Sequence, residues 1–188
     1  MKQIKLGEKT VDVKTSLSEI NLNDFEKIME IFKTTYDVGI DKYINIIQIL
    51  STLSKDEIEE LDLDVFEDLI AEIQDINDFS KEAEDIFINE LSIMDVKFKT
   101  KSDGTSYKFT VKEMLLLKDK LAINPDAVVI DLAMIIFKPV SIDNEGYLDI
   151  TESKKREYFG TEIMMNVMIP YLMSLSNYFQ NKNVKESL

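Results

Sequence analysis

Residues 23–53 read NDFEKIMEIFKTTYDVGIDKYINIIQILSTL, and the spacing of their apolar side chains decides the fold class. The first apolar group recurs every three or four residues, at Phe25, Ile28, Met29 and Phe32. That period is typical of an amphipathic helix, for which Asn23 and Glu26 are expected to form a capping box. After the turn at 37–39 the same period returns at Tyr43, Ile44, Ile47, Leu50 and Leu53. The stretch therefore predicts two consecutive helices.

The flanking segments extend this pattern in both directions. Ile4 and Leu6, and then Val11 and Val13, alternate around the turn at 7–10, which predicts a β-hairpin. Ser54 and Glu57 have the spacing of a second capping box, and helical periodicity then continues to residue 76 with an expected break at 62–64. The first part of the chain is predicted to be a hairpin followed by helices.

The second half has a similar order of patterns. Alternating residues at 96–98 and 107–111 surround Ser102-Asp103-Gly104, which predicts another hairpin. Thr110 and Glu113 are spaced as a capping box, and a further helix is expected between 124–125 and Pro139. A long terminal helix is predicted over 158–179, with a kink at Pro170, whose nitrogen has no proton to donate.

These patterns predict a mainly α fold made of two similar units, each with a short β-hairpin followed by about three helices. The expected divisions are an acidic unit at 1–78, a helical linker at 79–93 and a second unit at 94–188. An internal duplication would explain the repeated order. The alternative is that capped helices after hairpins are common in any small α+β protein.

Composition narrows the function. The chain has 188 residues, 45% of them hydrophobic, and neither cysteine nor histidine. It therefore has no thiol or imidazole for nucleophilic catalysis, and the five glycines never cluster into a phosphate-binding loop. We expect no enzymatic activity and no cofactor.

The sequence also favours a cytoplasmic protein, in a host cytoplasm if a phage encodes it. The N-terminal residues contain no apolar signal-peptide core, and the longest apolar stretches fall short of the roughly 20 residues that span a bilayer. The net charge of −14 repels nucleic acid and anionic membranes, so neither is an expected partner.

The negative charge is concentrated in one half of the chain. Residues 1–93 hold 9 basic and 23 acidic residues, which accounts for the whole net charge, and residues 56–90 hold 15 acidic residues against Lys81 alone. Such a run is either a solvated helix face or a negative surface for a basic partner.

A methionine-rich segment is the candidate partner-binding site. Its residues are Met164, Met165, Met168, Tyr171, Leu172 and Met173. Flexible thioether side chains repack around partners of different shape, so the segment could form a pliable groove for client helices. The alternative is an ordinary core helix, in which methionine fills gaps.

Residues 141–152 have the spacing of an EF-hand calcium loop. Asp143, Glu145, Asp149 and Glu152 fall at ligand positions and Gly146 at the turn position. Ser141 occupies the first position, where a carboxylate normally binds calcium, and Pro139 interrupts the entering helix. We expect a glycine turn and no bound metal, and keep these four residues as a weak candidate site.

The chain resembles bacteriophage tail assembly chaperones in general style. The similarity is carried by the hairpin at 2–13, the capped helices at 22–34 and 41–53, the segment FTVKEMLLLKDKLAINPDAVVIDLAMIIF at 109–137 and an apolar C-terminal helix. No diagnostic motif is matched, so no family residue is carried over. The resemblance implies a chaperone in virion assembly that shelters apolar helices of a client such as the tape-measure protein.

Three other hypotheses remain open at this stage. The chain could be a structural virion protein of a neck or ring, where a homo-oligomer would be natural. It could be an acidic DNA mimic that inhibits a basic protein. A carboxylate-only metalloenzyme ranks last, because no group of carboxylates stands out.

Overall fold

The computed structural model describes the chain except for residues 7, 35–38, 77–86, 94–95, 103, 105–106, 124–127, 141–150 and 187–188, and the side chains of 6, 34, 72, 75, 121, 123 and 177–186. The described part contains eight helices and two small antiparallel sheets, which confirms the mainly α prediction. The elements are β1 (Lys2–Leu6), β2 (Lys9–Val13), α1 (Leu22–Thr34), α2 (Ile40–Leu50), α3 (Lys55–Glu59), α4 (Leu63–Asp75), β3 (Glu90–Ile93), β4 (Val96–Lys99), α5 (Val111–Ile123), α6 (Val128–Ile136), β5 (Lys138–Pro139), α7 (Glu152–Glu162) and α8 (Met165–Glu186). No helix in this part is long and apolar enough to cross a membrane.

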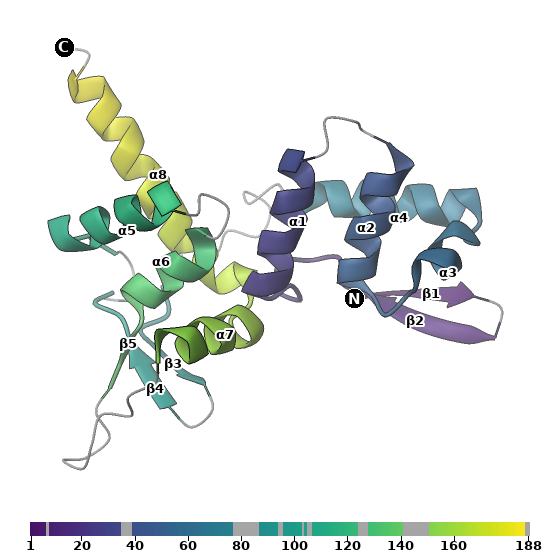
Figure 1. The fold of residues 1–188 in the computed structure, drawn as a ribbon, viewed down its shortest axis with the longest axis horizontal. Coiled ribbons are helices and arrows are strands. Elements are labelled where there is room, and N and C mark those ends of the chain that lie inside the picture. Colours follow the sequence, from purple (N-terminus) through teal and green to yellow (C-terminus); the bar gives the residue numbers. More distant parts are fainter. Residues whose placement is uncertain are drawn as a thin grey trace.

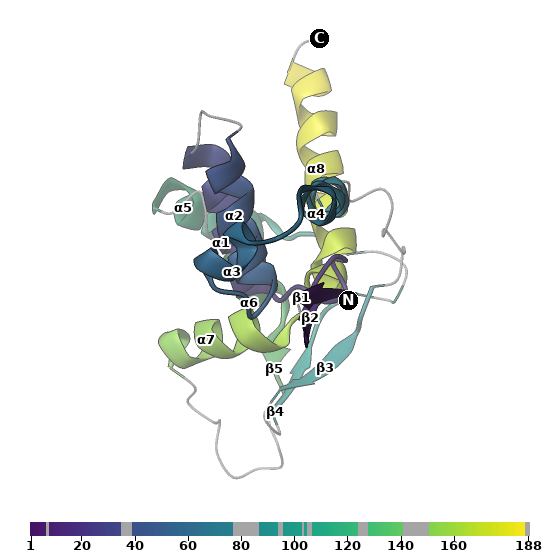
Figure 2. The same cartoon turned by 90° about the vertical axis from the view of Figure 1, so that its right-hand side faces the viewer.

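The elements form two lobes along the long axis of the molecule (Figure 1). We call β1, β2 and α1–α4 the N-terminal lobe, and β3–β5 with α5–α8 the C-terminal lobe. Helix α1 lies where the lobes meet, and α8 projects away from the body in both views (Figures 1 and 2). The buried apolar side chains of the two lobes form one continuous cluster, so the lobes share a core.

The predicted N-terminal hairpin is confirmed. Strands β1 and β2 pair antiparallel, with Lys2 opposite Val13 and Ile4 opposite Val11. Ile4, Val11 and Val13 are buried on one face, while their neighbours Lys5 and Asp12 are exposed on the other. The alternation of apolar and polar residues therefore corresponds to one buried and one exposed face of the hairpin.

The cap of α1 was predicted two residues too late. The Asp24 N–H donates to Asn21 Oδ1 at 2.8 Å, so Asn21 is the capping residue. Glu26 therefore does not cap its own helix, and its carboxylate instead accepts a hydrogen bond at 3.0 Å from the Ile130 N–H in the first turn of α6. A tertiary contact fixes the earlier start, because the Met165 N–H donates to the Ile20 carbonyl at 2.7 Å.

The capping box at Ser54 and Glu57 and the break after it are confirmed. Ser54 Oγ accepts from the Glu57 N–H at 3.3 Å, and the Glu57 carboxylate accepts from the Ser54 N–H at 2.8 Å. The short helix α3 ends at Glu59, and α4 begins at Leu63. Two helices of different direction therefore follow α2 within a few residues.

The second hairpin was predicted with the wrong partner strand. Strand β4 pairs with β3, with Glu90 opposite Lys99, and on its other edge with β5. The hairpin therefore joins 90–93 to 96–99, and the described residues 107–110 form no strand. Residues 90–93, assigned to a helical linker, are a strand; the linker's residues 79–86 lie outside the described part. The capping box at Thr110 and Glu113 is confirmed, with the Glu113 N–H 3.2 Å from Thr110 Oγ1.

The long terminal helix predicted over 158–179 is interrupted at Ile163 and Met164, and Pro170 lies inside the second part, α8. Ile163 is extended, at φ −88° and ψ 123°. Its carbonyl accepts from the Leu22 N–H at 3.0 Å, and Met164 forms a β-bridge with Asn21. The break thus exists because this segment pairs with the chain before α1, a contact that local periodicity does not encode.

The predicted duplication is not confirmed. The N-terminal lobe has a two-stranded sheet and the C-terminal lobe a three-stranded one, completed by β5 from later in the chain. The C-terminal lobe also has a core of edge-to-face aromatic rings, with centroid separations of 4.9 to 6.2 Å among Phe87, Phe98, Tyr107, Phe109, Phe137, Phe159 and Tyr171.

Candidate binding groove

An apolar groove opens on the surface of the N-terminal lobe, and we call it the α2–α4 groove. Helices α2, α3 and α4 enclose a volume of about 220 Å³, lined by Ile40, Ile44, Ile58, Glu59, Leu61, Leu63 and Phe66. The volume is below the roughly 300–1,000 Å³ of typical small-molecule pockets. It is suited to one or two side chains of a partner.

The floor and the edges of the groove differ in exposure. Ile44, Ile58 and Phe66 are buried and belong to the core. At the edges, Ile40 and Leu63 are 64% and 65% exposed. Because two such residues border one depression, they form a continuous apolar surface with it.

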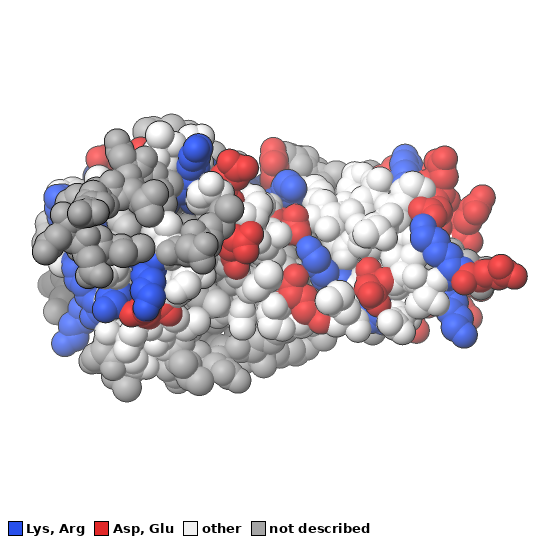
Figure 3. Space-filling model, turned by 90° about the horizontal axis from the view of Figure 1, so that it is seen from below, with Lys and Arg blue, Asp and Glu red and all other residues white. Residues whose placement is uncertain are grey.

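Acidic residues are frequent in the three helices that line the groove, and Glu59 is itself a lining residue. Exposed carboxylates flank the lining residues in sequence, at Asp41, Asp56, Glu59, Glu60, Asp62 and Asp64. Lys55 lies 3.5 Å from Glu59, and both side chains are half-exposed, so solvent screens this pair. Seen from below, acidic side chains are more frequent at this end of the molecule, with basic ones between them, and basic side chains are more frequent at the opposite end (Figure 3). The groove therefore combines an apolar surface with a negative field.

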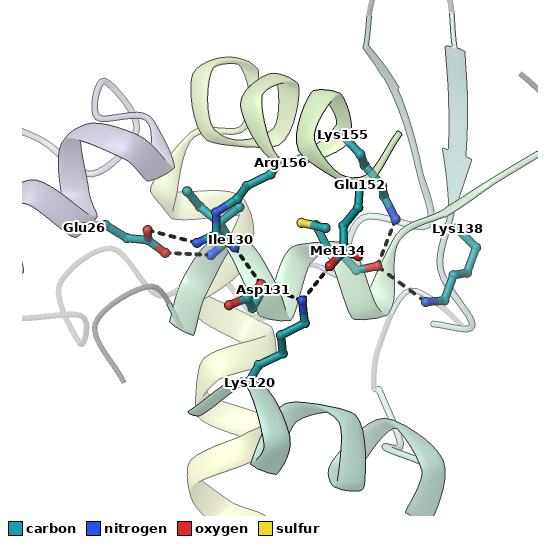
Figure 4. Close-up of polar contacts among 9 residues, drawn as sticks. All are labelled: Glu26, Lys120, Ile130, Asp131, Met134, Lys138, Glu152, Lys155 and Arg156. Carbon is teal, nitrogen blue, oxygen red and sulfur yellow. Dashed lines mark hydrogen bonds and ion pairs between the residues drawn. The ribbon is translucent and has the colours of Figure 1, made fainter. Parts of the chain in front are cut away.

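A second polar site is a network that joins the lobes (Figure 4). Arg156 of α7 donates to Asp131 Oδ1 of α6 at 2.7 Å, and its other terminal nitrogen lies 3.8 Å from Glu26 of α1. Lys120 of α5 lies 2.5 Å from Glu152 and 4.0 Å from Asp131. Every charge in this network has a partner, so we assign it a structural role.

Burial perturbs one carboxyl group in the network. It raises the pKa of Glu26 above its usual value, against the opposing effects of the Ile130 N–H and the Arg156 guanidinium. Asp131 is only 3% exposed and needs Arg156 as its counter-ion. The network thus ties α1, α6 and α7 together through two largely buried carboxylates and the partly exposed Arg156.

Lys155 lies in a mixed cleft of about 320 Å³ beside this network. Its ammonium donates to the carbonyls of Met134 at 2.9 Å and Phe137 at 3.0 Å, at the C-terminal end of α6. Burial and the neighbouring Lys138 lower the pKa of Lys155 to about 8. The hydrogen bonds satisfy helix carbonyls that would otherwise lack donors, which explains the residue as a helix cap.

The predicted methionine-rich site is mostly core. Met165, Met168 and Tyr171 have no exposed surface, Met164 and Leu172 are half-buried, and Met173 is 40% exposed. The Tyr171 hydroxyl donates to the Ile88 carbonyl at 2.7 Å, which anchors α8 to the segment before β3. A partner could reach Met173 directly, whereas the three fully buried residues would become available only if the lobe opened.

Of the calcium-loop candidates, only Glu152 lies in the described part. It is the first residue of α7 and pairs with Lys120, which lowers the pKa of its carboxyl. Asp143, Glu145 and Asp149 lie outside the described residues. Within the described ranges, no three carboxylates come close enough together to hold a metal ion.

Comparisons of this chain with models of protein families, with curated proteins and with solved structures found no match.

Proposed function

We propose that this protein is a non-enzymatic binding factor that holds an apolar helix of a client protein in the α2–α4 groove. The observation that carries the proposal is the exposure of Ile40 and Leu63 beside a groove with acidic surroundings. Contiguous apolar surface of this kind is characteristic of protein interaction sites.

The groove favours an amphipathic helix with basic residues at its edges. Helix-in-groove recognition uses apolar anchors spaced three, four or seven residues apart, and two anchors of this spacing would meet Ile40 and Leu63. Lysine or arginine beside the anchors would face the carboxylates at Asp41, Asp62 and Asp64. Complementary charge speeds association and disfavours acidic partners.

The general resemblance to tail assembly chaperones gives this binding a biological setting. In that setting the client is an assembly component with long apolar helices, such as a tape-measure protein, and the acidic surface keeps the complex in solution. Co-expression and pull-down with such a client tests the setting, since a chaperone co-purifies with the client and is missing from finished particles. Presence in finished particles would favour a structural virion protein.

A peptide titration tests the binding mode itself. A fluorescent helical peptide with leucines at positions i, i+4 and i+7 and flanking lysines should bind, and the same peptide with flanking glutamates should not. Leu63→Glu should abolish binding, whereas Asn166→Glu, an exposed position on α8, should leave it unchanged. Equal binding to wild type and Leu63→Glu would refute the proposal.

The acidic DNA-mimic hypothesis is favoured by a different observation, the run of exposed carboxylates on α3 and α4. A mimic would bind a basic DNA-binding protein through charge alone. Its complex would dissociate at high salt. The Leu63→Ala variant would keep the affinity of wild type for such a protein, whereas a helix bound in the groove would bind this variant more weakly.

A further inference from the structure

Helix α5 exposes an apolar face at the opposite end of the molecule from the groove. Val111, Leu115 and Leu116 are 77%, 56% and 41% exposed, and we call these three residues the α5 face. Val111 and Leu115 are one helical turn apart and point in the same direction, with Leu116 beside them. A single exposed leucine needs no explanation, but three on two turns of one helix form a patch.

Basic side chains accompany this face. Lys112 and Lys118 are exposed, and helical spacing places Lys118 on the same row as Val111 and Leu115. Asp119 is the acidic residue beside them. The α5 face is therefore an apolar helix surface with lysines interspersed, which is the chemistry that the α2–α4 groove is proposed to bind.

We infer that the α5 face of one copy of this chain occupies the α2–α4 groove of another. Leu115 and Val111 would contact Ile40 and Leu63, and Lys112 and Lys118 would face the carboxylates around the groove. This inference rests on the proposed function, because it takes the groove as a helix-binding site and names a second copy of the chain as an occupant.

The placement of the two surfaces determines the type of association. The groove and α5 lie at opposite ends of the long axis (Figure 1), so one copy cannot fill its own groove. Contact between unlike surfaces is heterologous, and it produces a closed ring or an open chain of copies instead of a two-fold dimer. Because a copy bound in the groove blocks a client helix, self-association and client binding compete.

Sedimentation velocity over a range of protein concentrations tests the inference. Wild type should associate as concentration rises, and association should weaken as salt screens the charges. Leu63→Glu and Leu115→Glu should each weaken association at least tenfold, whereas Asn166→Glu should not. Both substituted leucines are exposed, so the variants are expected to fold.

Mixing the two variants gives the decisive result. The Leu115→Glu copy retains an intact groove and the Leu63→Glu copy an intact α5 face, so an equimolar mixture should form a dimer of one copy each that grows no further. A mixture that stays monomeric while wild type associates would overturn the inference. So would association that Leu115→Glu abolishes and Leu63→Glu does not, because α5 would then pair with α5.

The peptide titration separates this inference from the proposed function. Wild-type protein that stays monomeric at several hundred micromolar yet binds the lysine-flanked peptide refutes self-association alone. Wild-type protein that neither self-associates nor binds the lysine-flanked peptide refutes the groove as a binding site.

Discussion

Replacing Arg156 by methionine is expected to destabilise the protein by about 2–3 kcal/mol. The substitution keeps most of the side-chain volume but leaves the Asp131 carboxylate, whose side chain is 4% exposed, without its 2.7 Å partner. Removing one partner of a fully buried pair costs about 3–5 kcal/mol, and an exposed pair is worth about 0.2–1 kcal/mol. The expected loss lies between these values, because Arg156 is 35% exposed and Lys120 lies 4.0 Å from the same carboxylate.

Urea denaturation followed by circular dichroism measures this loss, and calorimetry should show a fall in Tm of about 5–10 °C for a chain of this size. Lys154→Met is the matched control, since Lys154 is exposed on the same helix and should change stability by less than about 0.5 kcal/mol. Adding Asp131→Asn to Arg156→Met should recover about half of the loss, because the uncompensated charge is gone. A loss below about 0.5 kcal/mol for Arg156→Met would refute the structural role of the network.

Three further substitutions test the packing and the caps. Because burial raises the pKa of Glu26 in the folded state, this carboxyl contributes stability at low pH that is lost as pH rises through the folded pKa. The free energy of unfolding of wild type relative to Glu26→Gln should therefore fall as pH rises above the usual glutamate pKa, and a difference that stays constant with pH would contradict the raised pKa. Gly160→Ala should destabilise by about 1–3 kcal/mol, since its new Cβ would clash with the side-chain amide of Asn23; Asn23→Ala in the same chain should restore stability. Thr110→Ala should cost about 1 kcal/mol in urea denaturation through loss of the α5 cap, and Thr110→Ser should cost much less.

Local signals in the sequence predicted the local structure well. The N-terminal hairpin, the caps at Ser54 and Thr110 and the break before α4 depend on residues within a few positions of one another. Alternation and capping chemistry are expressed at that range. They could therefore be found without knowledge of the rest of the chain.

Errors arose where distant segments compete with local signals. Strand β4 pairs with β3 and not with the residues after Gly104. Its other edge pairs with β5. The terminal helix broke at Ile163 because the segment before α1 pairs there, while Pro170 was accommodated inside α8. Strand β5 and the segment before α1 are far away in sequence from their partners, which periodicity does not identify, whereas β3 directly precedes β4.

The candidate sites also differ in whether local sequence signals or contacts with the rest of the chain determine their exposure. The methionine-rich segment has the composition of both a core helix and a binding helix, and only the packing of the C-terminal lobe separates the two. Exposure of Leu63 has a local signal, because it is the first residue of α4 and lies between the exposed carboxylates of Asp62 and Asp64. Exposure of Ile40 has no such signal, since its spacing from the buried Ile44 is that of one helix face.

Chemical-shift mapping of the ¹⁵N-labelled chain, titrated with the lysine-flanked helical peptide, tests the α2–α4 groove most directly. The largest shifts are expected at Ile40, Ile44, Glu59, Leu63 and Phe66, with little change at the end of α7 or in β4. Binding that shifts residues elsewhere and leaves these five unchanged would contradict the groove as the binding surface.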